Sequence, residues 1–223
     1  METTYPNTEA EKAHMLYVKE QILAEADKFY QEFLRDSVHK GIFTLRTATQ
    51  WMEEARQRPI PKMLFGEFWF EGELCILFAD TNLGKSILAV QIGNSISRGE
   101  HIPGFFLQSE KRPILYFDFE LSDKQFENRY SVNYQDHYAF DENFIRVEMN
   151  PEAEIPDGLS FEDFLNHSLE RSIVETGARV LIIDNLTYLK NETEKAKDAL
   201  PLMKHLKALK SKYGLSILAL QGL

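Results

Sequence analysis

Hydrophobic and polar positions follow a helical period over the first part of the chain. Between residues 8 and 36, apolar side chains recur at steps of three and four with charged residues between them: Met15, Val18, Ile22, Ala26, Phe29 and Phe33. This spacing predicts one long amphipathic helix. A second helix is expected over residues 47–58, because Pro59 and Pro61 prevent it from continuing.

The pattern changes after these prolines. The segment Pro59-Ile60-Pro61 is the predicted boundary between an N-terminal helical extension with its linker, residues 1–62, and a second domain, residues 63–223. In the second domain, short apolar strands are expected near residues 73–78, 114–119, 144–149, 179–183 and 215–220. Helices are expected near residues 85–97, 122–133, 160–175 and 194–213, the last with a break at Pro201. This alternation predicts a three-layer α/β domain whose mostly parallel central sheet is covered by helices on both faces.

Composition and charge narrow the classes of function. The chain is 43% hydrophobic and 27% charged, as in an ordinary globular protein, and its formal net charge is −10. A protein of this charge does not coat nucleic acid by charge alone, so any contact with nucleic acid is expected to be local. Cys75 is the single cysteine, which excludes a disulfide within the chain and a cysteine-based metal site.

Neither a membrane span nor a signal peptide is recognisable in the sequence. The longest apolar runs are far shorter than the roughly 18 residues that a spanning helix needs. The N-terminus also lacks a basic segment followed by an apolar one. The cytoplasm is therefore the expected compartment, with no contact to a membrane.

A phosphate-binding pattern lies between the first expected strand and the helix after it: Ala79, Asp80, Thr81, Asn82, Leu83, Gly84, Lys85 and Ser86. A loop in this position presents backbone N–H groups at a helix N-terminus, where the helix dipole favours bound phosphate. Lys85 would supply a positive charge to the β- and γ-phosphates of ATP, and Ser86 a hydroxyl to Mg²⁺. The alternative is a Gly-Lys-Ser turn that only begins a helix.

Two positions depart from the commonest form of this loop. Ala79 replaces the first glycine, and Asp80 places a carboxylate near a polyphosphate, so it has to point away or be held by a partner. Gly84 accepts left-handed backbone geometry without strain, and Asn82 tolerates it better than most residues.

Three further strand ends carry polar side chains. Asp184 ends the fourth expected strand and would hold the Mg²⁺ shell through water, the alternative being a residue that caps the next loop. Glu120 ends the second strand and would orient the attacking water, with Asp118 on the same strand face as a support. The alternative for Asp118 and Glu120 is that both are solvated residues at the edge of the site without a catalytic role. Gln221 ends the fifth strand and is a candidate sensor of the γ-phosphate, or an ordinary polar residue.

A resemblance to a known family centres on residues 119–129, which read Phe-Glu-Leu-Ser-Asp-Lys-Gln-Phe-Glu-Asn-Arg. This is similar to the DnaB stretch in which the catalytic glutamate is followed by Leu or Met, by Ser, and then by Gln and Arg on the next helix. Over residues 64–223 the chain resembles the RecA-type P-loop ATPase superfamily. More narrowly, it resembles the RepA and DnaB hexameric replicative helicases of bacterial plasmids and mobile elements.

The resemblance assigns expected roles to the matching positions. It implies that Glu120 is the catalytic base, that Lys85 and Ser86 are the phosphate-loop pair, that Asp184 is the Mg²⁺ aspartate and that Gln221 is the sensor. It also implies a RecA-like strand order of 3-2-4-5-1. That order would set Glu120 beside Asp184, with the strand ending in Gln221 between Asp184 and the phosphate loop.

The same resemblance implies partners. It predicts a ring-like homo-oligomer such as a hexamer, ATP at the subunit interfaces, and single-stranded DNA as a ligand. Family members continue beyond the fifth strand into a DNA-binding loop, further strands and often an arginine finger. The ATPase core is therefore expected to be incomplete at its C-terminus, and something is expected to cover the apolar edge of the first strand.

The motifs and the resemblance are consistent with two classes of function, and a third possibility remains open. The leading expectation is an ATP-hydrolysing motor of helicase type that acts in DNA replication or mobilisation. The alternative is a RecA-fold regulatory or assembly module that binds ATP without unwinding DNA. A chain that folds but is catalytically inactive is the third possibility. For the N-terminal helix, packing on its own domain and docking on a neighbouring subunit both remain open.

Overall fold

The computed structural model describes residues 17, 20, 44–80, 82–186 and 199–222. It divides into two compact units, residues 1–59 and residues 60–223. The long helix expected over residues 8–36 lies outside the described residues, apart from Tyr17 and Glu20, which are helical and exposed.

The first unit contains the helix α2 (Ala48–Ala55). Thr47 begins it through a reciprocal capping box: the Thr47 hydroxyl accepts the Gln50 N–H, and the Gln50 side chain accepts the Thr47 N–H. The helix ends at Arg56, shortly before Pro59, and is shorter than predicted. All residues of α2 are exposed, including Trp51.

The second unit is built on a five-stranded parallel sheet. Its strands are β3 (Leu74–Ala79), β4 (Ile114–Asp118), β7 (Phe144–Val147), β8 (Val180–Asp184) and β9 (Ser216–Gly222). They pair in the order β3-β9-β8-β4-β7, and every pair is parallel. Counted along the chain, this order reads 3-2-4-5-1 from the β7 edge. The predicted RecA-like strand order is therefore confirmed.

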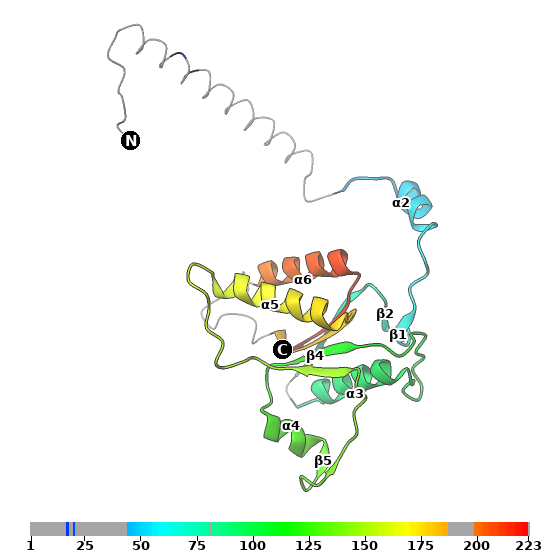
Figure 1. Cartoon of the computed structure of the whole chain (residues 1–223). Coiled ribbons are helices and arrows are strands. Elements are labelled where there is room, and N and C mark those ends of the chain that lie inside the picture. The colour runs from blue at the N-terminus through cyan, green and yellow to red at the C-terminus, as the bar shows by residue number, and fades with distance from the viewer. Residues whose placement is uncertain (1–16, 18–19, 21–43, 81, 187–198, 223) are drawn as a thin grey trace, which may run out of the picture. The chain divides into compact units, whose positions relative to one another are not determined.

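Helices cover both faces of this sheet, which gives the three predicted layers (Figure 1). Helices α5 (Phe161–Thr176) and α6 (Ala199–Tyr213) lie on one face, and α3 (Lys85–Arg98) lies on the other. The face under α5 and α6 presents Leu115, Phe117, Leu181, Ile183, Ile217 and Ala219. The face under α3 presents Ile114, Tyr116, Val180, Ile182, Leu218 and Leu220. Since successive strand residues point to opposite faces, strands buried on both sides read as continuous apolar runs.

Three short elements differ from the sequence-based expectations. The helix α4 (Asp123–Arg129) ends four residues earlier than predicted. It is followed by a hairpin of β5 (Ser131–Val132) and β6 (Asp136–His137), whose turn contains left-handed backbone at Asn133 and Tyr134. The expected break at Pro201 is wrong, because α6 is continuous through that residue. Its expected start near residue 194 lies outside the described residues.

A second unpredicted hairpin lies beside the first strand of the sheet. It consists of β1 (Met63–Phe65) and β2 (Trp69–Phe70), and it buries Leu64 and Trp69 in the core on the α3 side. In the described part of the chain, β3 pairs with β9 alone. The hairpin and β3 line an apolar cavity of about 420 Å³, so the edge of β3 is only partly covered.

No helix in the described ranges is long and apolar enough to cross a membrane.

Helix α3 approaches the sheet closely at Gly93. A Cβ atom at this position would lie 2.9 Å from the Phe144 ring and 3.0 Å from the Ile182 Cδ1 atom. We therefore expect Gly93→Val to lower the free energy of unfolding by about 1–3 kcal/mol, because overpacking outweighs the small gain in helix propensity. Urea denaturation measures this. Gln91→Val, at an exposed position of the same helix, is the control; equal stability of the two variants would contradict the close approach.

Candidate functional site

The phosphate-binding loop connects β3 to α3, as the sequence predicted. Gly84 is the N-cap of α3, with φ 81° and ψ 15°, and Asn82 has φ 65°. Both are thus left-handed, which is the backbone geometry that only Gly and a few residues such as Asn adopt readily. Turns of this kind arrange backbone N–H groups around an anion. Thr81 lies outside the described residues.

Lys85 folds back over the loop. Its ammonium donates to the carbonyl oxygens of Ala79 and Asp80, each at 2.7 Å. An ammonium has three donors, so this arrangement leaves one for a further acceptor such as a phosphate oxygen. Asp80 and Leu83 are both exposed to solvent.

Ser86 and Asp184 meet across the α3 face of the sheet. Asp184, the last residue of β8, is only 3% exposed, and the Ser86 side chain lies close enough to its carboxylate to influence the pKa of that group. The Tyr116 hydroxyl of β4 donates to Oδ2 of the same carboxylate at 2.6 Å. Burial raises the pKa of Asp184, and the nearby Tyr116 and Ser86 hydroxyls oppose that rise. Burial and the Asp184 charge raise the pKa of Tyr116 far above its usual range, so the hydroxyl remains a donor.

Asp118 supports the turn that carries Glu120. Its carboxylate accepts the backbone N–H groups of Glu120 at 3.2 Å and Leu121 at 3.0 Å. Asp118 is 2% exposed, so the interpretation of this residue as a solvated edge acid is wrong. Glu120 itself lies two residues beyond the end of β4, where it is largely but not fully exposed.

Arg146 of β7 neutralises Asp118 from the neighbouring strand. Its Nε donates to Asp118 Oδ2 at 2.9 Å, and its guanidinium also contacts Asp123 and the carbonyl oxygen of Leu121. The guanidinium carbon lies 4.7 Å from the centre of the Phe126 ring. These contacts fix both sides of the turn between β4 and α4. Arg146 was not predicted as a site residue, because its only signal in the sequence is a single cation inside an apolar strand.

Glu120 lies next to the end of β8. The Asn185 amide donates to Glu120 Oε1, and the Phe119 N–H donates to the Asp184 carbonyl oxygen at 2.8 Å. Partial burial raises the pKa of Glu120, as do the charges of Asp184 and Asp118, whereas Lys85 and Arg129 lower it.

These contacts place Glu120 beside the end of β8, as the predicted strand order required. Asn185 was not predicted as a site residue, because its partner Glu120 is 65 residues away in the sequence.

Gln221 lies near the end of β9, between the other strand ends. It is half-buried and pairs in register with Phe78 of β3. Because β9 lies between β8 and β3, Gln221 occupies the rim between Asp184 and the phosphate-binding loop. Among the residues that the structure describes, none forms a hydrogen bond with the Gln221 side chain that would assign it a role.

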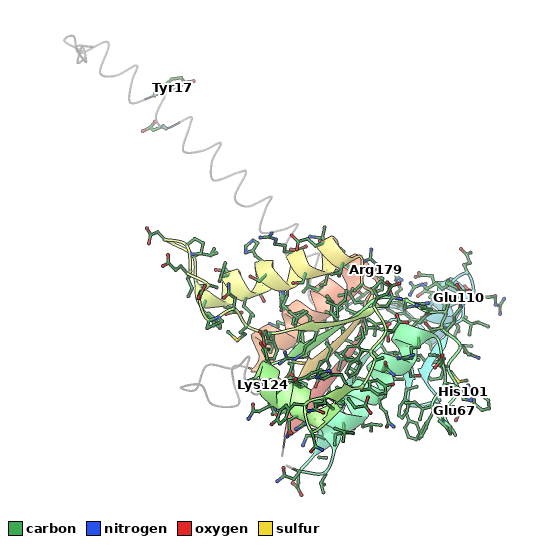
Figure 2. The ribbon with its side chains drawn as sticks, turned by 60° about the horizontal axis from the view of Figure 1, so that its bottom comes forward. Tyr17, Glu67, His101, Glu110, Lys124 and Arg179 are labelled. Atoms are coloured by element: carbon green, nitrogen blue, oxygen red, sulfur yellow. The ribbon has the colours of Figure 1, made fainter. Side chains whose placement is uncertain are left out.

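All these positions share one rim because the strands are parallel and their carboxyl ends face the same way. Figure 2 shows Lys124, just beyond the end of β4, well apart from Arg179, which precedes β8. The candidate side chains follow the strand ends on the Lys124 side. In the described ranges, no three His, Cys, Asp or Glu side chains are grouped to hold a metal ion.

The segment after Glu120 has a structural explanation as well. Ser122 is the N-cap of α4, and Gln125 completes a capping box with it. Arg129 is the last residue of α4. Its positive charge is close enough to Glu120 and Asp184 to oppose part of the rise in the pKa of each carboxyl. The Ser and Gln of this stretch therefore begin the helix that brings Arg129 toward the site.

Comparisons with known proteins agree with this architecture. Among solved structures, a KaiC-like protein from the hyperthermophilic archaeon Pyrococcus horikoshii OT3 matches with a TM-score of 0.50 and 18% sequence identity. The match covers 72% of this chain and 65% of that protein, and it shows a shared RecA-like fold. A search of curated proteins found no significant match. The model of the AAA domain family matches residues 43–221, which is most of the sequence. The chain therefore belongs to the AAA domain family and has the fold of a RecA-type P-loop ATPase.

Proposed function

We propose that this chain binds ATP with Mg²⁺ and hydrolyses it, as the ATPase core of a RepA/DnaB-like helicase motor. The observation that carries the proposal is the approach of Ser86, at the start of α3, to the buried carboxylate of Asp184, with Glu120 held beside the end of β8 by Asn185. A phosphate-loop hydroxyl, a buried carboxylate and a candidate base thus lie at one rim of the sheet, although they are far apart in the sequence.

The residues of this rim fit Mg²⁺ and a polyphosphate. A hydroxyl from Ser86 and a carboxylate from Asp184 are the oxygen ligands that Mg²⁺ prefers. When bound, Mg²⁺ neutralises charge on the phosphates. Lys85 and the backbone N–H groups at the start of α3 would bind the β- and γ-phosphates.

Glu120 is the group suited to accept a proton from the attacking water. Its raised pKa makes it a stronger base than an ordinary carboxylate. The Asn185 amide and the Asp118-supported turn orient the carboxylate. Gln221 would contact the γ-phosphate and sense its presence.

The helicase assignment is supported by the resemblance of residues 119–129 to the DnaB stretch. The proposed helicase would form a ring-like homo-oligomer with ATP at the subunit interfaces, would bind single-stranded DNA, and would act in DNA replication or mobilisation.

The net charge of −10 favours the second candidate function, a RecA-fold assembly or regulatory module that does not unwind DNA. ATP-dependent strand displacement on a forked duplex would support the motor. ATP-dependent oligomerisation without displacement would support the module.

Lys85→Ala tests nucleotide chemistry at the loop. We expect this variant to lower the ATPase rate by about a hundredfold or more, because a charge that stabilises the transferring phosphoryl group is lost. Binding of a fluorescent ATP analogue at micromolar concentration should also weaken. Lys207→Ala, an exposed lysine on α6, is the control and should keep the wild-type rate. Hydrolysis at the wild-type rate by Lys85→Ala would contradict the proposed function.

A further inference from the structure

The buried carboxylate of Asp184 accepts a hydrogen bond from the Tyr116 hydroxyl of β4, whose Oη atom lies 2.6 Å from Oδ2. The Ser86 side chain, at the start of α3, lies near the same carboxylate. Tyr116 pairs in register with Ile182, two residues before Asp184 on β8. Residues two apart on a strand share a face, so the tyrosine ring lies along the α3 face and ends at the carboxylate.

Packing alone does not explain the Tyr116 hydroxyl. The ring is 1% exposed among apolar neighbours, and its centre lies 5.7 Å from that of the Phe144 ring. A phenylalanine would fill this position without burying a polar group, and a buried hydroxyl is unfavourable unless it has a hydrogen-bond partner. The hydroxyl therefore depends on Asp184 as its acceptor. The carboxylate in turn gains a fixed donor.

We propose that Tyr116 is a positioning residue for the metal-binding carboxylate of Asp184. The torsion that rotates an aspartate carboxylate is broad and weakly restrained by itself. By binding Oδ2, Tyr116 sets this rotation and leaves the other carboxylate oxygen for the Mg²⁺ shell beside Ser86. This inference rests on the proposed function, because it assigns Tyr116 to the same nucleotide site.

The test uses Tyr116→Phe in the full chain with Mn²⁺ as a spectroscopic probe in place of Mg²⁺. Mn²⁺ affinity is measured by electron paramagnetic resonance in the presence of a non-hydrolysable ATP analogue. We expect the affinity to fall by about 10–100-fold, as is typical when the hydrogen-bond partner of a metal ligand is removed. The Mg²⁺ concentration for half-maximal ATPase activity should rise in parallel. Affinity for the analogue in EDTA should be unchanged.

Tyr213→Phe is the matched control. It also removes a tyrosine hydroxyl that bonds a carboxylate, that of Glu170, on the α5 and α6 side of the sheet. It should leave Mn²⁺ affinity unchanged. If Tyr116→Phe matches this control, the positioning role is overturned.

A double-mutant cycle with Asp184→Asn separates positioning from general damage to the fold. If Tyr116 acts through Asp184, the Tyr116→Phe change should have little further effect on Mn²⁺ affinity once Asp184 is replaced. Equal losses in both backgrounds would overturn the inference, even if Tyr116→Phe lowers stability. A wild-type chain that binds no Mn²⁺–nucleotide would refute the proposed function itself. Mn²⁺ binding that requires Asp184 but not the Tyr116 hydroxyl would refute only this inference.

Discussion

Replacement of Glu120 by glutamine is expected to lower the rate of ATP hydrolysis by about 10²–10⁴-fold, the usual contribution of a positioned general base. Binding of the ATP analogue should be retained, because Lys85, Ser86 and Asp184 are unchanged. A glutamine carbonyl can still accept the hydrogen bond that the Asn185 amide donates to Glu120, so the turn should keep its geometry. A steady-state ATPase assay measures the loss.

The pH dependence of the rate gives an independent check on this role. Glu120 has to be ionised to accept a proton, and its pKa is raised above the usual 4.5, chiefly by partial burial. The wild-type rate should therefore fall as the pH is lowered through this raised pKa, and the residual rate of Glu120→Gln should lack that acid limb. Glu127→Gln, on the neighbouring α4, should behave as wild type. Hydrolysis by Glu120→Gln at the wild-type rate would exclude Glu120 as the base.

Arg146→Met is expected to lower the free energy of unfolding by about 3–5 kcal/mol, because it leaves Asp118 as a buried charge without its partner. The Asp118 side chain is 1% exposed and that of Arg146 is 18% exposed, so water screens this pair weakly. The substitution also removes the contacts of the guanidinium with Leu121 and Asp123. We therefore expect the ATPase rate to fall as well, since the turn that carries Glu120 loosens.

Urea denaturation of Arg146→Met should be compared with that of Arg171→Met. Arg171 forms an exposed ion pair with Glu175 on α5, and loss of such a pair costs less than about 1 kcal/mol. The two variants thus make the same chemical change in a buried pair and in an exposed one. If both lose the same small amount of stability, Arg146 does not hold the turn.

Local signals in the sequence predicted most of the sheet and the phosphate-binding loop. Apolar runs identified all five strands to within two residues, since burial on both faces leaves no polar alternation. Gly84 and Asn82 were expected to accept left-handed geometry, and both have it. Gly99 and Gly177 end α3 and α5 as left-handed C-caps, the conformation that glycine adopts most readily. Each of these features depends on neighbouring residues alone.

The two hairpins were not predicted, because their formation depends on distant residues rather than on neighbouring ones. The strands of β1–β2 and β5–β6 are two or three residues long, which is too short for a periodic pattern to develop. Trp69 is stabilised by burial against the α3 side of the core rather than by its local sequence. Packing against distant elements decided these segments.

The candidate site divides in the same way. The sequence by itself determined which acids and hydroxyls stand at strand ends and at the start of α3: Ser86, Asp118, Glu120 and Asp184. Their partners came only from the tertiary structure, because Tyr116 is 68 residues from Asp184, Asn185 is 65 from Glu120 and Arg146 is 28 from Asp118. Local periodicity carries no information on which strands become neighbours. The parallel pairing of β7, β4 and β8 created these contacts, and with them the buried carboxylates on which the proposed chemistry depends.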